Sequence, residues 1–335
     1  MKIAFFEIHD WEAEIIEKVF SGHQLFFSDK PLTLENVAQV KDYEVLSVFI
    51  YSKIDKTLLA KMPNLKYITT RSMGLDHINL KDCRKRGVDV SCAPHYGDNS
   101  VAEHAFGLIL SISRNIHKAY VRTLNKNYSI EGLKGFDLKG KTIAVIGVGR
   151  IGSHVVKMAN SFEMNILAVD RHPQKDLIKN CNCKYVSLAD ALKKSDIVTL
   201  HVPYCEANHH LMNEKTFKRM KRGAILINTS RGPVVDTKAL LDALDSGQLS
   251  GAGLDVLEGE ELIKEEKELL HDPTKFLNLK KMHQLAIDHE LLNDEKVVFT
   301  PHIAFYSQEA VQRILDVTID NIRAFLKKKP INVVN

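Results

Sequence analysis

The sequence has few cysteines and no paired spacing among them: five occur in 335 residues, and none forms a Cys-x-x-Cys motif. A disulfide framework and a zinc ribbon are therefore disfavoured, and the cysteine usage is typical of a reducing cytoplasm. Long apolar runs are also missing, since no stretch approaches the roughly 18 residues that suggest a membrane span. Glu7 and Asp10 interrupt the N-terminal apolar run, which disfavours a signal peptide. We therefore expect a cytoplasmic protein that does not enter a membrane.

Neither sign of charge dominates the sequence. The 46 Lys and Arg residues and the 42 Asp and Glu residues leave a net charge of +4, and the positive residues do not form long blocks. This distribution predicts neither a nucleic-acid nor a membrane partner. The length is about twice that of a usual domain and the composition is ordinary for a globular chain, so we expect two compact units.

Apolar, strand-like runs alternate with helical patterns along the whole chain. This order predicts an α/β protein with doubly wound parallel sheets covered by helices. Because the apolar runs are continuous, we expect strands that are buried on both faces. The expected strands span residues 2–8, 45–51, 66–70, 142–147, 165–170, 197–202, 224–229, 250–254 and 297–300.

Two long helices are expected outside the strand regions. The first begins at Asn99 or Ser100, with Glu103 as a capping-box partner, and we place a domain crossing just before it. The second spans residues 307–328 and has one apolar face. Residues 258–295 are charged and helix-prone and show no strand pattern, so we interpret them as a solvated helical insertion between two strands of one sheet.

Residues 141–161 contain a strand, a Gly-x-Gly-x-x-Gly turn and a helix-compatible stretch, in that order. Gly147 allows the tight turn, Gly149 lets the backbone approach a pyrophosphate, and Gly152 lets the helix pack on the strand. The helix N-terminus offers N–H donors to anionic oxygens. An isolated glycine motif is weak evidence, but here it stands in the context that a dinucleotide site requires.

An acidic residue supports the same interpretation. Asp170 ends the next expected strand, where a carboxylate can accept hydrogen bonds from the adenosine ribose hydroxyls. The alternative is a plain glycine turn followed by an ordinary strand-end aspartate. A carboxylate would also repel a 2′-phosphate, which favours NAD over NADP, although Arg171 would partly offset that repulsion.

Further polar residues follow three later strands: Arg231, then Asp255 with Glu260, and finally His302. Ligands bind at the carboxyl ends of strands in an open parallel sheet, so these side chains could converge on a cofactor held by the glycine turn. Taken singly, each is more often a surface ion-pair member, a solvated charge or a loop residue. Together they suit hydride transfer to a 2-oxo acid. Arginine holds the carboxylate and polarises the ketone, histidine supplies the proton, and a carboxylate orients the imidazole.

These motifs together resemble those of the D-isomer-specific 2-hydroxyacid dehydrogenases, and the resemblance covers nearly the whole chain. It is greatest to the D-lactate dehydrogenase branch. It implies that Arg231 binds the substrate, that His302 is the acid/base and that Glu260 is its partner. The matching segments are residues 147–152 with Asp170, Ser230-Arg231-Gly232, residues 254–260 and Pro301-His302.

The choice of Glu260 rests only on its spacing from Asp255. Glu258, Glu261 and Glu265 stand nearby, and residues 258–295 are longer than the family pattern. The sequence therefore leaves the glutamate assignment open between neighbouring positions.

The resemblance also implies a domain organisation. A Rossmann NAD-binding domain, residues 99–300, is inserted into a flavodoxin-like catalytic domain made of residues 1–98 and 301–335. It further implies a homodimer formed through the cofactor domains.

Other positions are assigned by the resemblance alone. Backbone amides around Met73 and Gly74 receive the substrate carboxylate, Tyr96 is an active-site tyrosine, and Phe305 lies near the substrate side chain. From the residues themselves, the alternatives are a plain turn at Met73 and Gly74 and a buried aromatic at Tyr96. The implied cofactor-binding residues are Gly147, Gly149, Arg150, Ile151, Gly152, Asp170, Val202, Pro203, Thr229 and Asp255.

The predicted function is that of an NAD-dependent D-lactate dehydrogenase, which transfers hydride reversibly between NADH and pyruvate. One alternative is a reductase of glyoxylate, hydroxypyruvate or a branched 2-oxo acid. Another is an NAD-sensing, corepressor-like binding protein, which the absence of low-complexity tails disfavours. No metal site is predicted, because the His209-His210 pair shows no ligand arrangement in the sequence.

Overall fold

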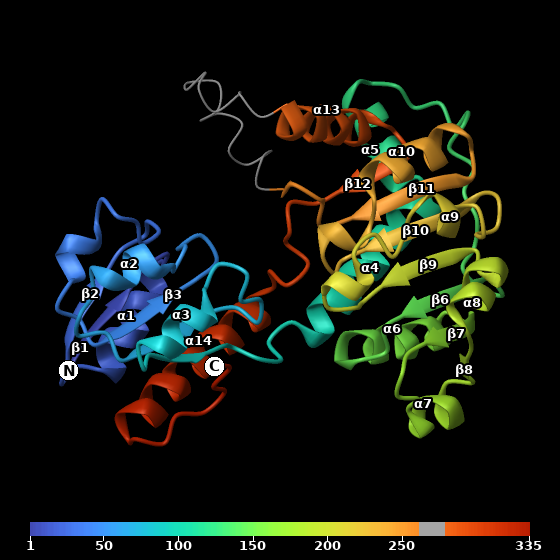
Figure 1. Cartoon of the computed structure of the whole chain (residues 1–335). Coiled ribbons are helices and arrows are strands. Elements are labelled where there is room, and N and C mark those ends of the chain that lie inside the picture. The colour runs from blue at the N-terminus through green and yellow to red at the C-terminus, as the bar shows by residue number, and fades with distance from the viewer. Residues whose placement is uncertain (261–278) are drawn as a thin grey trace. The chain divides into compact units, whose positions relative to one another are not determined.

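The computed structural model describes residues 1–260 and 279–335, which form two compact units. Unit 1 consists of Met1–Tyr96 and Ser307–Asn335, and unit 2 of Gly97–Tyr306 (Figure 1). The chain therefore leaves unit 1 and returns to it, with unit 2 between the two crossings.

Unit 1 contains a five-stranded parallel sheet with the strand order β2-β1-β3-β4-β5. This is the order of flavodoxin-like doubly wound sheets. Its elements are β1 (Lys2–Phe5), α1 (Asp10–Val19), β2 (Gln24–Phe27), η1 (Val37–Val40), β3 (Val45–Val48), α2 (Lys56–Ala60), β4 (Tyr67–Thr70), α3 (Leu80–Lys85), β5 (Asp89–Ser91) and α14 (Gln308–Leu326).

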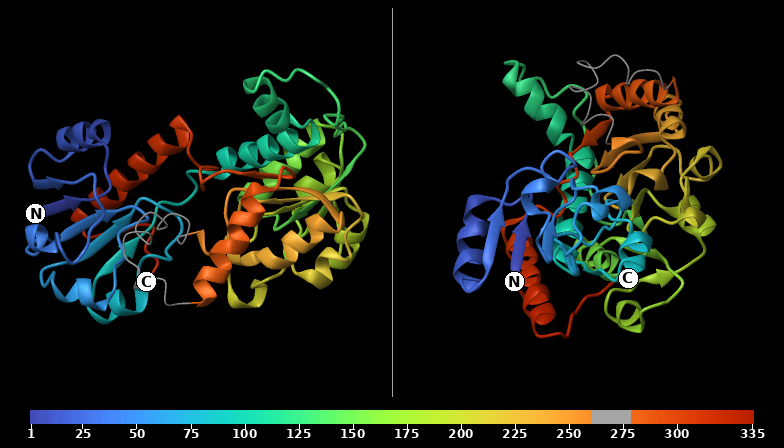
Figure 2. Two further views of the ribbon diagram at one scale, coloured as in Figure 1. Left: turned by 90° about the horizontal axis from the view of Figure 1, so that it is seen from above. Right: turned by 60° about the vertical axis from the view of Figure 1, so that its left-hand side comes forward.

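Both faces of this sheet are covered because successive strand residues point to opposite sides. Ile3 and Phe5 of β1 pack on α1 and α14, whereas Ala4 and Phe6 pack on the side of η1, α2 and α3. Helix α14, near the C-terminus, thus packs on one face of a sheet whose strands all come from the first 96 residues (Figure 2).

Unit 2 contains a seven-stranded parallel sheet with the order β12-β11-β10-β9-β6-β7-β8. The strand order reverses between β6 and β9, and ligands bind at such a switch point. Its elements are α4 (Asp98–Ser113), α5 (Ile116–Leu124), β6 (Thr142–Ile146), α6 (Arg150–Ser161), β7 (Asn165–Val169), α7 (Lys175–Asn180), β8 (Lys184–Tyr185), α8 (Leu188–Lys194), β9 (Ile197–Leu200), η2 (Glu206–Asn208), α9 (Glu214–Phe217), β10 (Ala224–Asn228), η3 (Gly232–Val234), α10 (Thr237–Asp245), β11 (Leu249–Leu254), α13 (Leu279–Asn293) and β12 (Val297–Phe299).

The seven-stranded sheet is also buried on both faces. Ile143 and Val145 of β6 face a core formed with α4 and α6. Ala144 and Ile146 face a second core formed with α8, α9, α10 and α13. The predicted α/β class with two doubly wound parallel sheets is therefore confirmed.

Several strand predictions were too long or missing. The strand expected at residues 2–8 ends at Phe5, and Glu7 then turns the chain with a left-handed backbone (φ 55°). The Glu7 carboxylate accepts hydrogen bonds from the amides of Tyr51 and Ser52 at 2.8 and 3.0 Å, which holds this turn against the end of β3. Strands β2, β5 and β8 were missed because they are short edge strands with weak apolar runs.

The capping box expected at Glu103 is wrong. Helix α4 begins earlier, with Gly97 as its N-cap, and the Glu103 carboxylate instead accepts a hydrogen bond from the Asn99 side chain at 2.6 Å. The i, i+4 spacing of these two side chains on one helix face explains the pairing.

The described part of residues 258–295 is not simply a solvated insertion. Residues 261–278 lie outside the described residues, but α13 places Ile287 and Leu291 in the core beneath the sheet. Among the helices of the described ranges, none has the length and apolar character needed to cross a bilayer.

The fully buried Asp288 of α13 generates a pH-dependent prediction. Burial raises the pKa of Asp288 to about 6, and the Gln284 side-chain amide donates a hydrogen bond to Oδ1 at 2.9 Å. Since this pKa exceeds the unfolded value, the native state binds the proton more tightly, and stability should fall as the pH rises from about 4 through 6.

We expect Asp288→Asn to remove this loss. Its free energy of unfolding relative to the wild type should improve by about 2 to 3 kcal/mol between about pH 4 and pH 7, measured by urea denaturation. The exposed Asp320→Asn on α14 is the control. The prediction would be contradicted if Asp288→Asn and the wild type differed in free energy of unfolding by the same amount at about pH 4 as at about pH 7.

Candidate active site

The carboxyl ends of three neighbouring strands align at one edge of the unit 2 sheet. Asn228, which ends β10, pairs with Leu254 of β11, and Leu254 pairs with Phe299 of β12. Arg231, Asp255 and His302 follow these strand ends within three residues. The pairing register therefore places all three residues at the same edge of the sheet.

The glycine turn occupies the switch point between β6 and β9. Gly147 has φ +89°, and a Cβ there would come within 2.7 Å of the His201 carbonyl oxygen, so this position requires glycine. Gly149 is the N-cap of α6, and a Cβ on it would meet no atom within 4 Å. A Cβ on Gly152 would overlap the carbonyl oxygen of Gly147. The turn is thus tight on its inner side and open at Gly149, as a pyrophosphate site requires.

Asp170 connects the end of β7 to this turn. Its two carboxylate oxygens accept hydrogen bonds from the amides of Val148 at 2.7 Å and His172 at 2.9 Å. Each carboxylate oxygen can accept more than one hydrogen bond, so these contacts leave capacity for a ribose hydroxyl. The assignment of Asp170 to the ribose stays a prediction.

Sequence reasoning missed Gln174, which supports the turn from the following loop. Its amide nitrogen donates to the Val148 carbonyl oxygen at 2.5 Å and lies 3.0 Å from the Ser153 hydroxyl of α6. A loop glutamine outside any motif has no signal in the sequence that would reveal this contact.

Two buried polar atoms at this edge have no hydrogen-bond partner among the described residues: Thr229 Oγ1 after β10 and His201 Nδ1 after β9. His201 Nε2 pairs with Thr199 Oγ1 at 2.8 Å, and desolvation of the ring lowers the pKa of His201 to about 3, so the imidazole is neutral. Buried polar atoms are normally satisfied. Orphaned groups beside an open glycine turn fit a polar ligand such as a dinucleotide.

Arg231 lies in a turn that Asn228 holds together. The Asn228 side chain accepts from the Ser230 amide at 3.0 Å and donates to the Arg231 carbonyl oxygen at 3.0 Å. The next residue, Gly232, packs so tightly on the backbone of Leu257 that a Cβ would overlap it. The arginine turn therefore lies directly against the segment that continues to residue 260.

His302 and Glu260 form a pair in unit 2. The distance from His302 Nδ1 to Glu260 Oε2 is 3.3 Å, and the side chains are 34% and 14% exposed. Glu258, one of the alternatives, contacts His210 instead, with both carboxylate oxygens 3.0 Å from Nε2. Glu261 and Glu265 lie outside the described residues. Among the described glutamates of this segment, Glu260 is thus the one placed against His302.

Asp255 holds the loop that contains His302. This carboxylate is only 1% exposed, and it accepts hydrogen bonds from the Thr300 hydroxyl at 2.6 Å and from the amides of Ile303 and Ala304, both at 2.9 Å. The residues that make these contacts belong to unit 2, which ends at Tyr306. The chain passes from unit 1 to unit 2 after Tyr96. The predicted contact of Asp255 with the cofactor stays a prediction.

The remaining predicted site residues are spread over both units. Met73, Gly74 and Tyr96 belong to unit 1, where the Ser72 hydroxyl donates to the Gly74 carbonyl oxygen at 2.7 Å and shapes the loop. Phe305 belongs to unit 2 and packs edge-on against Tyr306. Val202 and Pro203 follow β9 at the same edge as the glycine turn, and Arg150 and Ile151 open α6.

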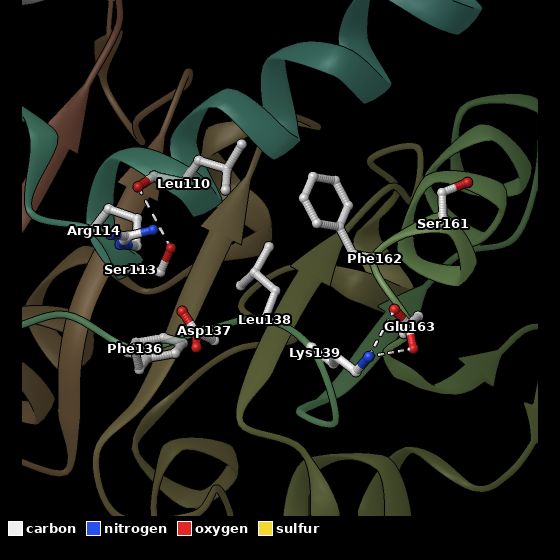
Figure 3. A pocket seen from close by; sticks show the side chains of 10 residues that line it. All are labelled: Leu110, Ser113, Arg114, Phe136, Asp137, Leu138, Lys139, Ser161, Phe162 and Glu163. Atoms are coloured by element: carbon white, nitrogen blue, oxygen red, sulfur yellow. Dashed lines mark hydrogen bonds and ion pairs between the residues drawn. The ribbon is translucent and has the colours of Figure 1, made fainter.

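A pocket of about 330 Å³ in unit 2 lies away from these residues (Figure 3). Its lining includes Phe136, Leu138 and Phe162, and Lys139 pairs with Glu163 at its rim at 2.8 Å. These segments precede β6 and β7, so the pocket lies at the amino ends of the strands. It contains no predicted site residue.

The glycine turn generates a test with an internal control. We expect Gly149→Ala to fold normally, because its methyl group meets no neighbour, but to bind NADH at least about tenfold more weakly, because the methyl occupies the space of the pyrophosphate. Gly152→Ala should instead lower the melting temperature. NADH fluorescence titration and thermal denaturation measure the two effects. Unchanged NADH affinity of Gly149→Ala would argue against this turn as the pyrophosphate site.

Comparison with known proteins gives matches over most of the chain. A 2-hydroxyacid dehydrogenase homolog of Haemophilus influenzae is 36% identical, over 96% of this chain and 95% of the relative. A glyoxylate reductase of Thermofilum pendens is 39% identical, over 89% of this chain and 82% of the relative. The crystal structure of D-lactate dehydrogenase from Aquifex aeolicus complexed with NAD and lactic acid superposes with a TM-score of 0.85 and 37% identity, covering 98% and 96% of the two chains.

A family model gives the assignment directly. Residues 106–304 match the D-isomer specific 2-hydroxyacid dehydrogenase, NAD binding domain. This match confirms the prediction of NAD as cofactor, and the glycine turn at the switch point with its orphaned polar neighbours fits that cofactor. The chain belongs to the family of NAD-dependent D-isomer-specific 2-hydroxyacid dehydrogenases.

Proposed function

We propose that the protein is a D-lactate dehydrogenase that interconverts pyruvate and D-lactate. The observation that supports this most directly is the pairing of His302 with Glu260 at the carboxyl edge of the NAD-binding sheet. A positioned imidazole and its carboxylate partner supply the acid/base function that reduction of a ketone requires. NAD supplies the hydride chemistry when it is bound.

His302 is the proton donor in this proposal. Its Nδ1 faces Glu260, so Nε2 is the atom that gives a proton to the ketone oxygen and takes it back in the reverse direction. The Glu260 carboxylate lies 3.3 Å from Nδ1 and fixes the orientation of the ring. The hydrogen bonds from residues 300–304 to Asp255 keep the histidine loop in place while the proton moves.

Arg231 is the substrate-binding arginine in this proposal. A guanidinium presents a planar set of donors that matches a carboxylate, and it can also polarise the neighbouring ketone. The side chain of Asn228 and the close packing of Gly232 hold the arginine turn.

The proposal extends to unit 1 as the catalytic domain. It assigns the backbone amides of Met73 and Gly74 to the substrate carboxylate and Tyr96 to the substrate site. The hydrogen bond from Ser72 to Gly74 supports this assignment. It gives the loop a defined turn from which backbone N–H groups can donate hydrogen bonds to a carboxylate.

The choice of pyruvate rests on Phe305 and on the relatives. A bulky ring beside the substrate side chain would leave room for little more than a methyl group. One similar structure is a D-lactate dehydrogenase complexed with lactic acid, whereas a similar curated protein is a glyoxylate reductase. Since one methylene in a pocket is worth only about 1 to 3 kcal/mol, neighbouring 2-oxo acids are the competing substrates.

A substrate panel tests the proposal. We expect pyruvate to give a higher kcat/KM with NADH than glyoxylate, hydroxypyruvate or a branched 2-oxo acid, and NADPH to be the poorer cofactor because of Asp170. Initial rates of NADH consumption and the chirality of the lactate measure this. Turnover of hydroxypyruvate without turnover of pyruvate would overturn the substrate assignment. NADH binding without turnover of any acid would favour the corepressor-like binding protein.

The acid/base pair is tested by conservative substitution. His302→Gln should lower kcat for pyruvate by about 10² to 10⁴ with nearly unchanged NADH affinity. Glu260→Gln should lower kcat less, because the imidazole remains. The exposed His283→Gln of α13 is the control. Wild-type turnover by His302→Gln would remove the histidine from the mechanism.

We also propose that the protein is a homodimer. No residue of α5, a helix described along its whole length, is buried, and Ile116, Tyr120 and Leu124 form one apolar face of it. Tyr128 and Ile130, just after the helix, are 77% and 86% exposed. Contiguous exposed apolar surface of this kind is typical of an interface between subunits.

The dimer is tested by placing a charge on α5. We expect the wild type to have twice the chain mass in solution and Leu124→Glu to shift toward the monomer, because a buried charge is costly in an apolar interface. Light scattering coupled to gel filtration measures the mass. Ile178→Glu, on an exposed position of α7, is the control. A monomeric wild type would exclude the dimer.

A further inference from the structure

Glu258 comes together in unit 2 with the adjacent residues His209 and His210, although 48 positions separate it from His210. The two imidazole rings are stacked, with centroids 3.9 Å apart, and His210 Nε2 lies 3.0 Å from both Glu258 oxygens. One potential ligand atom from each residue lies within 4.8 Å of the others. We propose that these three residues form a binding site for a zinc-class divalent cation, separate from the dehydrogenase chemistry.

The donor set fits this class of metal. The two imidazole nitrogens are borderline ligands, and together with one carboxylate oxygen they suit Zn²⁺ and its neighbours better than Mg²⁺ or Ca²⁺, which prefer oxygen alone. Donor atoms at about 2.0 to 2.2 Å from a tetrahedral ion lie roughly 3.3 Å apart. The contact between His210 and Glu258 is already close to that spacing, and a small movement of the exposed His209 completes it. A water molecule would take the fourth position.

The histidines have supporting groups behind them. Asp236 Oδ2 lies 3.8 Å from His210 Nδ1, and the Tyr204 hydroxyl lies 3.4 Å from His209 Nδ1. Metal-binding histidines commonly have such a partner on the second ring nitrogen, which leaves Nε2 for the ion. Asp236 is itself fixed, because its side chain caps α10 by accepting from the Ala239 amide at 3.0 Å.

The backbone of His210 is also held in place. Its amide donates to the Pro233 carbonyl oxygen at 2.9 Å, and its carbonyl oxygen accepts from the Asn213 side chain at 2.8 Å. The site therefore has one well-held ligand, His210, and a second, Glu258, on the 257–260 segment. The third, His209, is open to solvent. An ion can enter from the His209 side.

A titration with Zn²⁺ tests the site. The full chain, stripped with a chelator and desalted, is titrated in competition with a chromogenic zinc indicator. We expect saturation at one ion per chain and a higher melting temperature with zinc, because a ligand that binds only the native state stabilises it. His209→Gln should weaken binding by roughly tenfold or more. This side chain is exposed, so its replacement leaves the fold intact.

Two controls identify the ligands. Cys205 is an exposed thiol four residues before His209, so Cys205→Ser should bind zinc like the wild type, as should His283→Gln. Co²⁺ in place of zinc should give the visible bands of nitrogen and oxygen ligation without a thiolate charge-transfer band. The proposal is overturned by the absence of saturable binding, by equal binding to His209→Gln, or by loss of binding in Cys205→Ser. None of these outcomes depends on which 2-oxo acid the enzyme reduces.

Discussion

The buried carboxylate of Asp255 is the interaction on which the arrangement of the site depends. It accepts three hydrogen bonds from residues 300–304, on both sides of His302. A buried carboxylate is strongly destabilising unless donors surround it, so the histidine loop and the end of β11 are held together as one unit. Because Asp255 directly follows β11, the same contact fixes the starting point of the segment that reaches Glu260.

Residues 257–260 of that segment make contacts with three neighbouring parts of unit 2. Leu257 packs against Gly232 beside Arg231, Glu258 pairs with His210, and Glu260 pairs with His302. Only a few backbone bonds along residues 257–260 separate these three contacts. The parallel sheet makes this possible, because β10, β11 and β12 deliver their following loops to one edge.

The glycine turn and the His302–Glu260 pair both take their positions from the order of strands in unit 2. The glycine turn follows β6 at the switch point, and the polar loops follow β10, β11 and β12 on one side of it. Short-range patterns in the sequence predicted the strand, the glycine turn and the helix that follows it. The expected helix at residues 150–161 matches α6, and the glycine positions have the geometry that the motif requires. Gln174, Asn228 and His201 were missed as supporting residues because they act through contacts that no local pattern records.

The sequence by itself determined the α/β class, the strand, glycine turn and helix of residues 142–161, and the residue types available for acid/base chemistry, because these depend on neighbouring residues along the chain. Only the tertiary structure decided which glutamate faces which histidine. Glu260 and His302 are 42 positions apart, and His210 and Glu258 are 48 positions apart. Such pairs meet only when the strands between them have paired and their loops have packed, and the spacing along the chain contains no information on that packing.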